Sequence, residues 1–119
     1  MQNIQIFGVK NSQATRAAER FFKERRVAIQ LVDLKRKPMA PGEIKRFADR
    51  FGLLALVDTE GVAYIDAGLK YLKVSDGELL RRIEQEPKLL RLPLVRAGNR
   101  VSVGHDEESW KAMLADPAK

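Results

Sequence analysis

Cysteine is absent from the sequence, and histidine occurs once, as His105. Without cysteine the chain has no disulfide, no thiolate nucleophile and no ligand for an iron-sulfur cluster, and a single histidine does not complete a Cys/His zinc site. We therefore predict that the protein holds no metal and uses no cofactor.

Long apolar runs are also lacking. None approaches the roughly 18 residues that a membrane helix needs, and the first residues, Met1 to Gln5, lack the basic and apolar regions of a signal peptide. The sequence therefore predicts a cytoplasmic protein with no membrane partner.

The composition is that of a folded domain. The chain has 119 residues, of which 45% are hydrophobic. A chain of this length buries roughly 65% of the surface that its unfolded form exposes. Because no internal repeat, linker or low-complexity segment interrupts it, we expect one domain over residues 1–119.

Charge is distributed unevenly. Lys and Arg number 22 and Asp and Glu 16, which gives a net charge of +6, and residues 1–50 hold 12 of the cations but only 5 of the anions. An excess of this kind suits nucleic acid, an acidic protein surface or a solvated face that keeps a domain soluble. The basic surplus therefore marks the N-terminal half without choosing its partner.

A candidate basic surface lies on the first predicted helix, where Arg16, Arg20 and Lys23 occur between apolar positions. The neighbouring Phe21 and Phe22 belong to the apolar face, so they are predicted to be core and not platforms for stacking bases. We therefore expect an acidic protein partner and no sequence-specific binding of nucleic acid.

Hydrophobic periodicity and turn residues predict the order strand, helix, strand, helical middle, hairpin, helix. The first helix is capped by Ser12 or Asn11, and its helical spacing places Ala14, Ala17, Ala18, Phe21 and Phe22 on one apolar face. A later helix begins at the capping box Ser75 to Glu78. The predicted strands are 4–7, ended by Gly8, then 27–32, and 94–95 and 101–103 around Gly98 and Asn99. The later predicted helices are 43–51, ended by Gly52 and with Ile44, Phe47, Ala48 and Phe51 on one face, then 76–86, and one after Asp106 in which Trp110, Met113 and Leu114 share a face. This order predicts an α/β fold with a mixed sheet of about four strands, of which the first two are parallel.

The loop from Gly8 to Ser12 is the place to look for chemistry, because ligands bind at the carboxyl ends of parallel strands. Lys10 and the free N–H groups at the start of the first helix form a candidate anion site there.

Several blocks resemble the arsenate reductase (ArsC) family of thioredoxin-fold proteins, which includes YffB-like members and the regulator Spx. The most specific is Leu-Leu-Arg-Leu-Pro-Leu-Val at 89–95, followed by Val-Ser-Val-Gly-His at 101–105; residues 33–44 and 56–61 with Tyr64 resemble two more. The resemblance implies a thioredoxin-like fold, a four-stranded mixed sheet flanked by helices, with a helical insertion at about residues 54–90 and a cis peptide before Pro93.

The chain departs from the family at three functional positions. Ser12 stands where the family has its reactive cysteine, and Glu60 and Leu92 stand where it has basic residues for an oxyanion. Arg91 is one position early and, on a strand, would face the other way. His105 replaces an aromatic residue and is interpreted as a packing substitute. We therefore predict no catalytic residue: Ser12, Glu60 and Leu92 are vestigial active-site positions.

The function predicted from these residues is a non-catalytic binding or regulatory module. Two alternatives stay open. One is an arsenate-reductase-like or glutathione-dependent oxidoreductase. The other is a Spx-like transcription regulator, for which the resemblance implies binding to the C-terminal domain of the RNA polymerase α chain, with Gly52 the one matching feature nearby. A groove lined by Lys10, Asn11, Ser12 and Pro93 is the candidate site for a thiol, a peptide or an anion.

Overall fold

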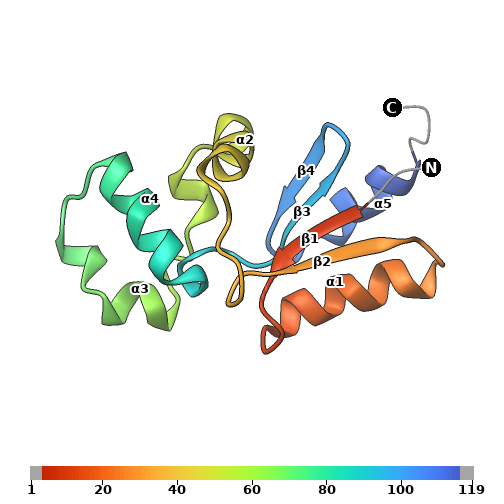
Figure 1. The fold of residues 1–119 in the computed structure, drawn as a ribbon, viewed down its shortest axis with the longest axis horizontal. Coiled ribbons are helices and arrows are strands. Elements are labelled where there is room, and N and C mark those ends of the chain that lie inside the picture. Colours follow the sequence, from red (N-terminus) through yellow and green to blue (C-terminus); the bar gives the residue numbers. More distant parts are fainter. Residues whose placement is uncertain (1–3, 116–119) are drawn as a thin grey trace. The chain divides into compact units, whose positions relative to one another are not determined.

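The computed structural model describes residues 4–115, and Figure 1 shows their course. The chain divides into two compact units. The first, here the sheet unit, comprises the residues up to Lys37 and those from Leu92 onward. The second, the helical unit, is the continuous segment Pro38–Arg91 between them.

The sheet unit contains four strands and two helices. They are β1 (Ile4–Gly8), α1 (Gln13–Glu24), β2 (Ile29–Asp33), β3 (Leu94–Ala97), β4 (Arg100–Val103) and α5 (Glu107–Ala115). The strand order is β2-β1-β3-β4, with β1 parallel to β2 and antiparallel to β3, and with β3 antiparallel to β4 (Figure 1). This arrangement confirms the predicted mixed sheet, the parallel first pair and the hairpin at Gly98.

The core of the sheet unit is built around Trp110 of α5, which is fully buried. Its ring lies 5.4 Å from that of Phe21 and 6.1 Å from that of Phe22, measured between centroids, and its indole N–H donates to the Ser102 hydroxyl at 3.2 Å. Aromatic rings at these separations add to the stabilisation from area burial, and the paired N–H avoids a desolvation cost. The interpretation of Phe21 and Phe22 as core is confirmed.

The helical unit consists of short helices. They are α2 (Pro41–Phe51), η1 (Leu54–Leu56), α3 (Val62–Asp66), η2 (Leu69–Tyr71), α4 (Asp76–Gln85) and η3 (Pro87–Leu89). The resemblance placed the start of the insertion near residue 54, but the compact unit begins at Pro38 and includes α2. The reason is that α2 contacts η1 and buries Ile44 and Phe47.

Backbone hydrogen bonds join the two ends of the helical unit. Asp58 N–H donates to Leu89 C=O at 2.8 Å, and Arg91 N–H donates to Leu56 C=O at 2.7 Å. These bonds lie beside an isolated antiparallel bridge between Val57 and Leu90. The unit is therefore closed by pairing between segments more than 30 residues apart.

Most helix ends lie where local sequence signals predict them. The Asp106 carboxylate accepts from Ser109 N–H at 3.1 Å, and Gly52, with φ of 88°, ends α2 as predicted. At α4, Ser75 accepts from Glu78 N–H at 3.2 Å. The return bond of the capping box does not form, because the Glu78 carboxylate instead binds Arg81 and Arg82.

Boundaries and buried faces differ in detail. Gly8 is the last residue of β1, where it pairs with Asp33, and does not lie beyond the strand. Phe51, predicted to share a face with Ile44 and Phe47, is 38% exposed at the end of α2, whereas those two are buried. Among residues 4–115 no helix is long and apolar enough to cross a membrane.

Candidate functional site

The turn between β1 and α1 is organised by Ser12. Its N–H donates to Val9 C=O at 3.1 Å, and its hydroxyl accepts from Thr15 N–H at 3.2 Å. With φ of −85° and ψ of 123°, Ser12 is the N-cap of α1. The hydroxyl of Ser12, predicted as a vestigial active-site position, thus satisfies a helix N–H that has no intrahelical partner.

Thr15 lies directly beneath the end of β1. A methyl group at Gly8 would meet the Thr15 hydroxyl oxygen at 2.4 Å, so the strand and α1 are in close contact at this point. Thr15 is fully buried, and its hydroxyl has no hydrogen-bond partner within residues 4–115. Helical spacing had placed Ala14 and Ala17 on the apolar face of this helix, but both are only half-buried and Thr15 takes the inner position.

The predicted vestigial positions fall in both units. Ser12 and half-buried Leu92 belong to the sheet unit, whereas Glu60 is an exposed residue of the helical unit. The peptide between Leu92 and Pro93 is cis, as the resemblance implied. Lys10 and Asn11 are exposed in the loop before α1. That Lys10, Asn11, Ser12 and Pro93 line one groove for a thiol, a peptide or an anion stays a prediction.

Arg91 has a different role from the one that strand alternation gave it. Strand β3 begins only at Leu94, so Arg91 does not lie on a strand and alternation does not orient it. Its side-chain Nε–H donates to Val57 C=O at 3.1 Å. This bond joins the last residue of the helical unit to Val57 in the same unit.

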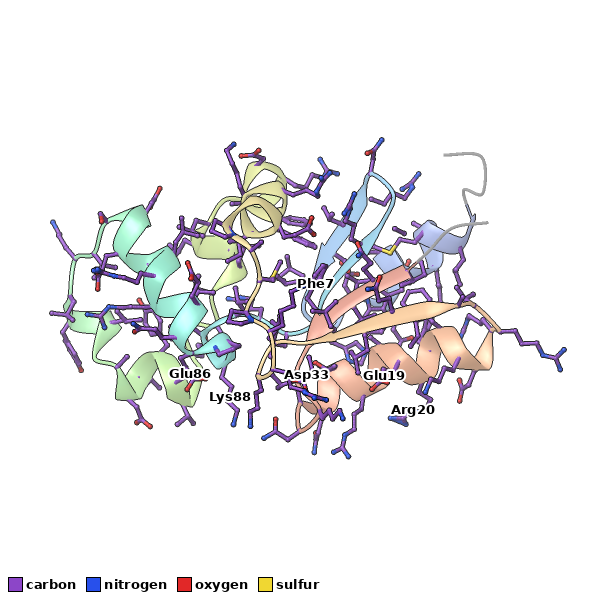
Figure 2. All side chains as sticks on the ribbon, in the orientation of Figure 1. Phe7, Glu19, Arg20, Asp33, Glu86 and Lys88 are labelled. Carbon is purple, nitrogen blue, oxygen red and sulfur yellow. The ribbon has the colours of Figure 1, made fainter. Side chains whose placement is uncertain are left out.

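The candidate basic surface Arg16, Arg20 and Lys23 is exposed along α1. Lys23 lies 4.0 Å from the Glu19 carboxylate. Within residues 4–115 no carboxylate forms an ion pair with Arg16 or Arg20. Figure 2 shows Arg20 directed away from the sheet, at the outer side of α1.

A cavity of about 690 Å³ opens beside these two arginines. It is lined by Gln13, Ala14, Arg16, Ala17 and Arg20 of α1 and by His105 from the segment between β4 and α5. Helical spacing identified the two arginines as neighbours, but no local pattern linked them to His105, which lies more than 80 residues away in the sequence.

His105 is held by two contacts. Its ring centroid lies 5.1 Å from that of Trp110, which agrees with the packing interpretation, and its Nε2 lies 3.2 Å from a Glu107 carboxylate oxygen. The side chain nevertheless remains 50% exposed. His105 is therefore a packing residue that also presents a polar ring to solvent. Among residues 4–115 no cluster of three or more His, Cys, Asp or Glu side chains is arranged to hold a metal ion.

Comparison with known proteins identifies relatives along nearly the whole chain. The ArsC family matches residues 7–113. An arsenate reductase from Neisseria meningitidis serogroup A is 29% identical over 117 residues, which cover 96% of this chain and 100% of that protein. The global transcriptional regulator Spx 2 from Oceanobacillus iheyensis is 24% identical over 113 residues, or 93% of this chain and 83% of that one.

Solved structures show the same fold. An arsenate reductase from Vibrio cholerae superposes with a TM-score of 0.80 at 18% sequence identity, covering 94% of this chain and 98% of that one. The likeness extends over the thioredoxin-like sheet with its helices, which confirms the predicted fold class.

Proposed function

The chain belongs to the ArsC family, and we propose that within this family it is a non-catalytic binding or regulatory module of the cytoplasm. The observation that carries the proposal is the residue at the start of α1. The full sequence contains no cysteine, and Ser12 at that position uses its hydroxyl to cap the helix.

The chemistry of Ser12 supports a structural role. A serine hydroxyl becomes a nucleophile only beside a general base, because it is not ionised near neutral pH. Within residues 4–115 the hydrogen bond that this hydroxyl forms is the one it accepts from Thr15 N–H. No described histidine or carboxylate is bonded to it, so its proton has no acceptor there that would activate it.

The direct test is an assay for arsenate reduction with glutathione and glutaredoxin. We expect no turnover above the rate without protein. The substitution Ser12→Cys should create a thiol that reacts rapidly with thiol reagents, because a helix N-terminus stabilises a thiolate. It should not restore arsenate reduction, because Glu60 and Leu92 still replace the basic residues expected for the oxyanion. Turnover by the unmodified chain that scales with its concentration would support the oxidoreductase alternative instead.

For the partner, we propose an acidic protein surface that contacts Arg16, Arg20 and Lys23. The support is that all three side chains are exposed on one helix and that the two arginines have no ion pair within the described residues. Charges of this kind act mainly on association rate and on specificity. Capture should therefore weaken steeply as salt is raised.

Charge reversal tests this surface. A tagged chain with Arg16, Arg20 and Lys23 all changed to Glu should lose the partner that the unmodified chain captures from its native cytoplasm. The matched control reverses Lys35, Arg36 and Lys37, three exposed cations of the same unit, and should keep that partner. Captured RNA polymerase would identify the Spx-like alternative, and equal capture by both variants would contradict the proposed surface.

A further inference from the structure

We propose that the cavity between α1 and His105 binds the phosphate group of a small organic phosphate. The inference goes beyond the proposed function, because it concerns a small-molecule site and does not require a protein partner. Three independent features support it: two arginines without a counter-ion among residues 4–115, an imidazole that a second segment contributes to the lining, and a volume larger than a bare anion needs.

Arg16 and Arg20 stand one helical turn apart and so lie on the same face of α1. Like charges at this spacing disfavour a helix, whereas an anion bound between them removes the repulsion. Guanidinium groups suit phosphate in particular, since each presents a planar pair of N–H donors that matches two phosphate oxygens. The pair is thus placed as a two-armed receptor for one phosphate group.

Arg16 and Arg20 have no counter-ion within the described part of the chain, although carboxylates lie within reach along the same helix. In other helices several cations form ion pairs with carboxylates three or four residues away, as in Lys45–Asp49, Arg46–Glu43 and Arg82–Glu78. Carboxylates stand equally close in sequence to Arg16 and Arg20. Glu19 pairs instead with Lys23, and Glu24 forms no ion pair with Arg20 within residues 4–115.

His105 and Gln13 add polar groups to the cavity. The imidazole comes from a different segment, and its contacts with Trp110 and Glu107 fix its position. Glu107 also brings a negative charge to this side of the cavity, so the anion is expected to sit nearer the arginines. The Gln13 amide, at the first turn of α1, supplies a further N–H donor.

The size of the cavity indicates an organic ligand. Its volume of about 690 Å³ falls in the range of sites for small molecules, roughly 300–1,000 Å³. The lining also includes Ala14 and Ala17 of the same helix, whose methyl groups offer an apolar surface. A phosphate on the guanidinium groups would leave this surface for the carbon skeleton of the ligand.

The probes that test the proposal are phenyl phosphate, inorganic phosphate and phenol, each titrated into the full-length protein and followed by amide chemical shifts. Phenyl phosphate is expected to shift residues 13–20 and His105 and to bind at least tenfold more tightly than either other probe. Phenol binding as tightly as phenyl phosphate would overturn the proposal and leave an apolar groove. Inorganic phosphate binding equally well would overturn the organic part of it.

Variants separate the cavity from the general positive charge. Arg16→Gln and Arg20→Gln should each weaken phenyl phosphate binding about tenfold, the loss expected when one charged donor pair is removed. Lys111→Gln removes the same charge from an exposed side chain of the same unit outside the cavity and should change the affinity less than twofold. Equal losses in all three variants would show diffuse charge attraction and overturn the site. A phosphopeptide that binds far more tightly than phenyl phosphate would show that the site serves a protein instead.

Discussion

The sheet unit and the helical unit differ in their net charge and in the apolar side chains that they expose. Residues 1–37 and 92–119 hold 13 Lys and Arg against 7 Asp and Glu, whereas residues 38–91 hold 9 of each. The whole net charge of the protein therefore resides in the sheet unit. Among the described residues, the large apolar side chains that remain exposed all belong to the helical unit; they are Phe51, Leu54, Val62, Ile65, Tyr71 and Leu72.

This contrast follows from how each unit makes its core. The sheet unit buries apolar residues between a sheet and two helices, and its aromatic residues Phe21, Phe22 and Trp110 are inside. In the helical unit α3 has only five residues and buries none of them. Short helices offer narrow apolar stripes, so part of their apolar surface stays in water. The two units consequently offer different surfaces, one electrostatic and one apolar.

The largest expected effect on stability comes from removing one buried aromatic ring from the core of each unit. Trp110→Ala in the sheet unit and Phe47→Ala in the helical unit both remove fully buried rings, and each should lower the free energy of unfolding by about 3–5 kcal/mol. Urea denaturation followed by circular dichroism measures the loss. If residues 1–119 form the predicted single domain, both variants unfold in one shared transition. Two separate transitions, each shifted by only one variant, would show that the units fold independently.

The close contact between β1 and α1 gives the next effect. Gly8→Ala places a methyl group against Thr15, and overpacking of this kind costs about 1–3 kcal/mol. Thr15→Ala on the Gly8→Ala background should recover part of that loss, because it removes the two atoms nearest to the new methyl group. A double-mutant cycle measures the coupling. Additive effects would mean that the contact between Gly8 and Thr15 does not limit packing.

Helix caps allow a matched comparison of the two units. Ser12 caps α1 in the sheet unit and Ser75 caps α4 in the helical unit, each through one N–H bond of 3.2 Å. Ser12→Ala and Ser75→Ala should therefore each cost about 1 kcal/mol, the usual value of an N-cap. A much larger loss at Ser12 would point to a role for its hydroxyl beyond capping. Thermal unfolding under identical conditions gives the comparison.

The smallest effect is expected on the apolar surface of the helical unit. Val62 and Tyr71 are 73% and 84% exposed, so Val62→Ser and Tyr71→Ser should each change stability by no more than about 0.5 kcal/mol. Their solubility at high concentration should improve, because exposed apolar area promotes association. A loss above about 2 kcal/mol for either variant would mean that its side chain is buried in solution, as a core substitution is.

Short stretches of sequence were sufficient to predict the helix caps and the hairpin turn, because the contacts that stabilise them are local. The caps at Ser12 and Asp106 and the turn at Gly98 join residues within a few positions of one another, so hydrogen-bonding side chains and tolerated φ values identify them directly. The family resemblance added the cis peptide before Pro93 and the thioredoxin-like fold. The absence of cysteine needed no structure at all.

The order of amino acids alone was enough to predict the class of fold, the main helices and strands and the loss of any thiol chemistry, because composition and short-range periodicity encode these. Tertiary contacts were needed to establish that Thr15 and not Ala14 is buried, that α2 belongs to the helical unit, that Arg91 binds Val57, and that His105 joins Arg16 and Arg20 at one cavity. The physical reason is that each of these depends on packing between segments distant in the sequence. Such packing is chosen by the shape and burial of the whole unit, and the periodicity of one segment does not encode it.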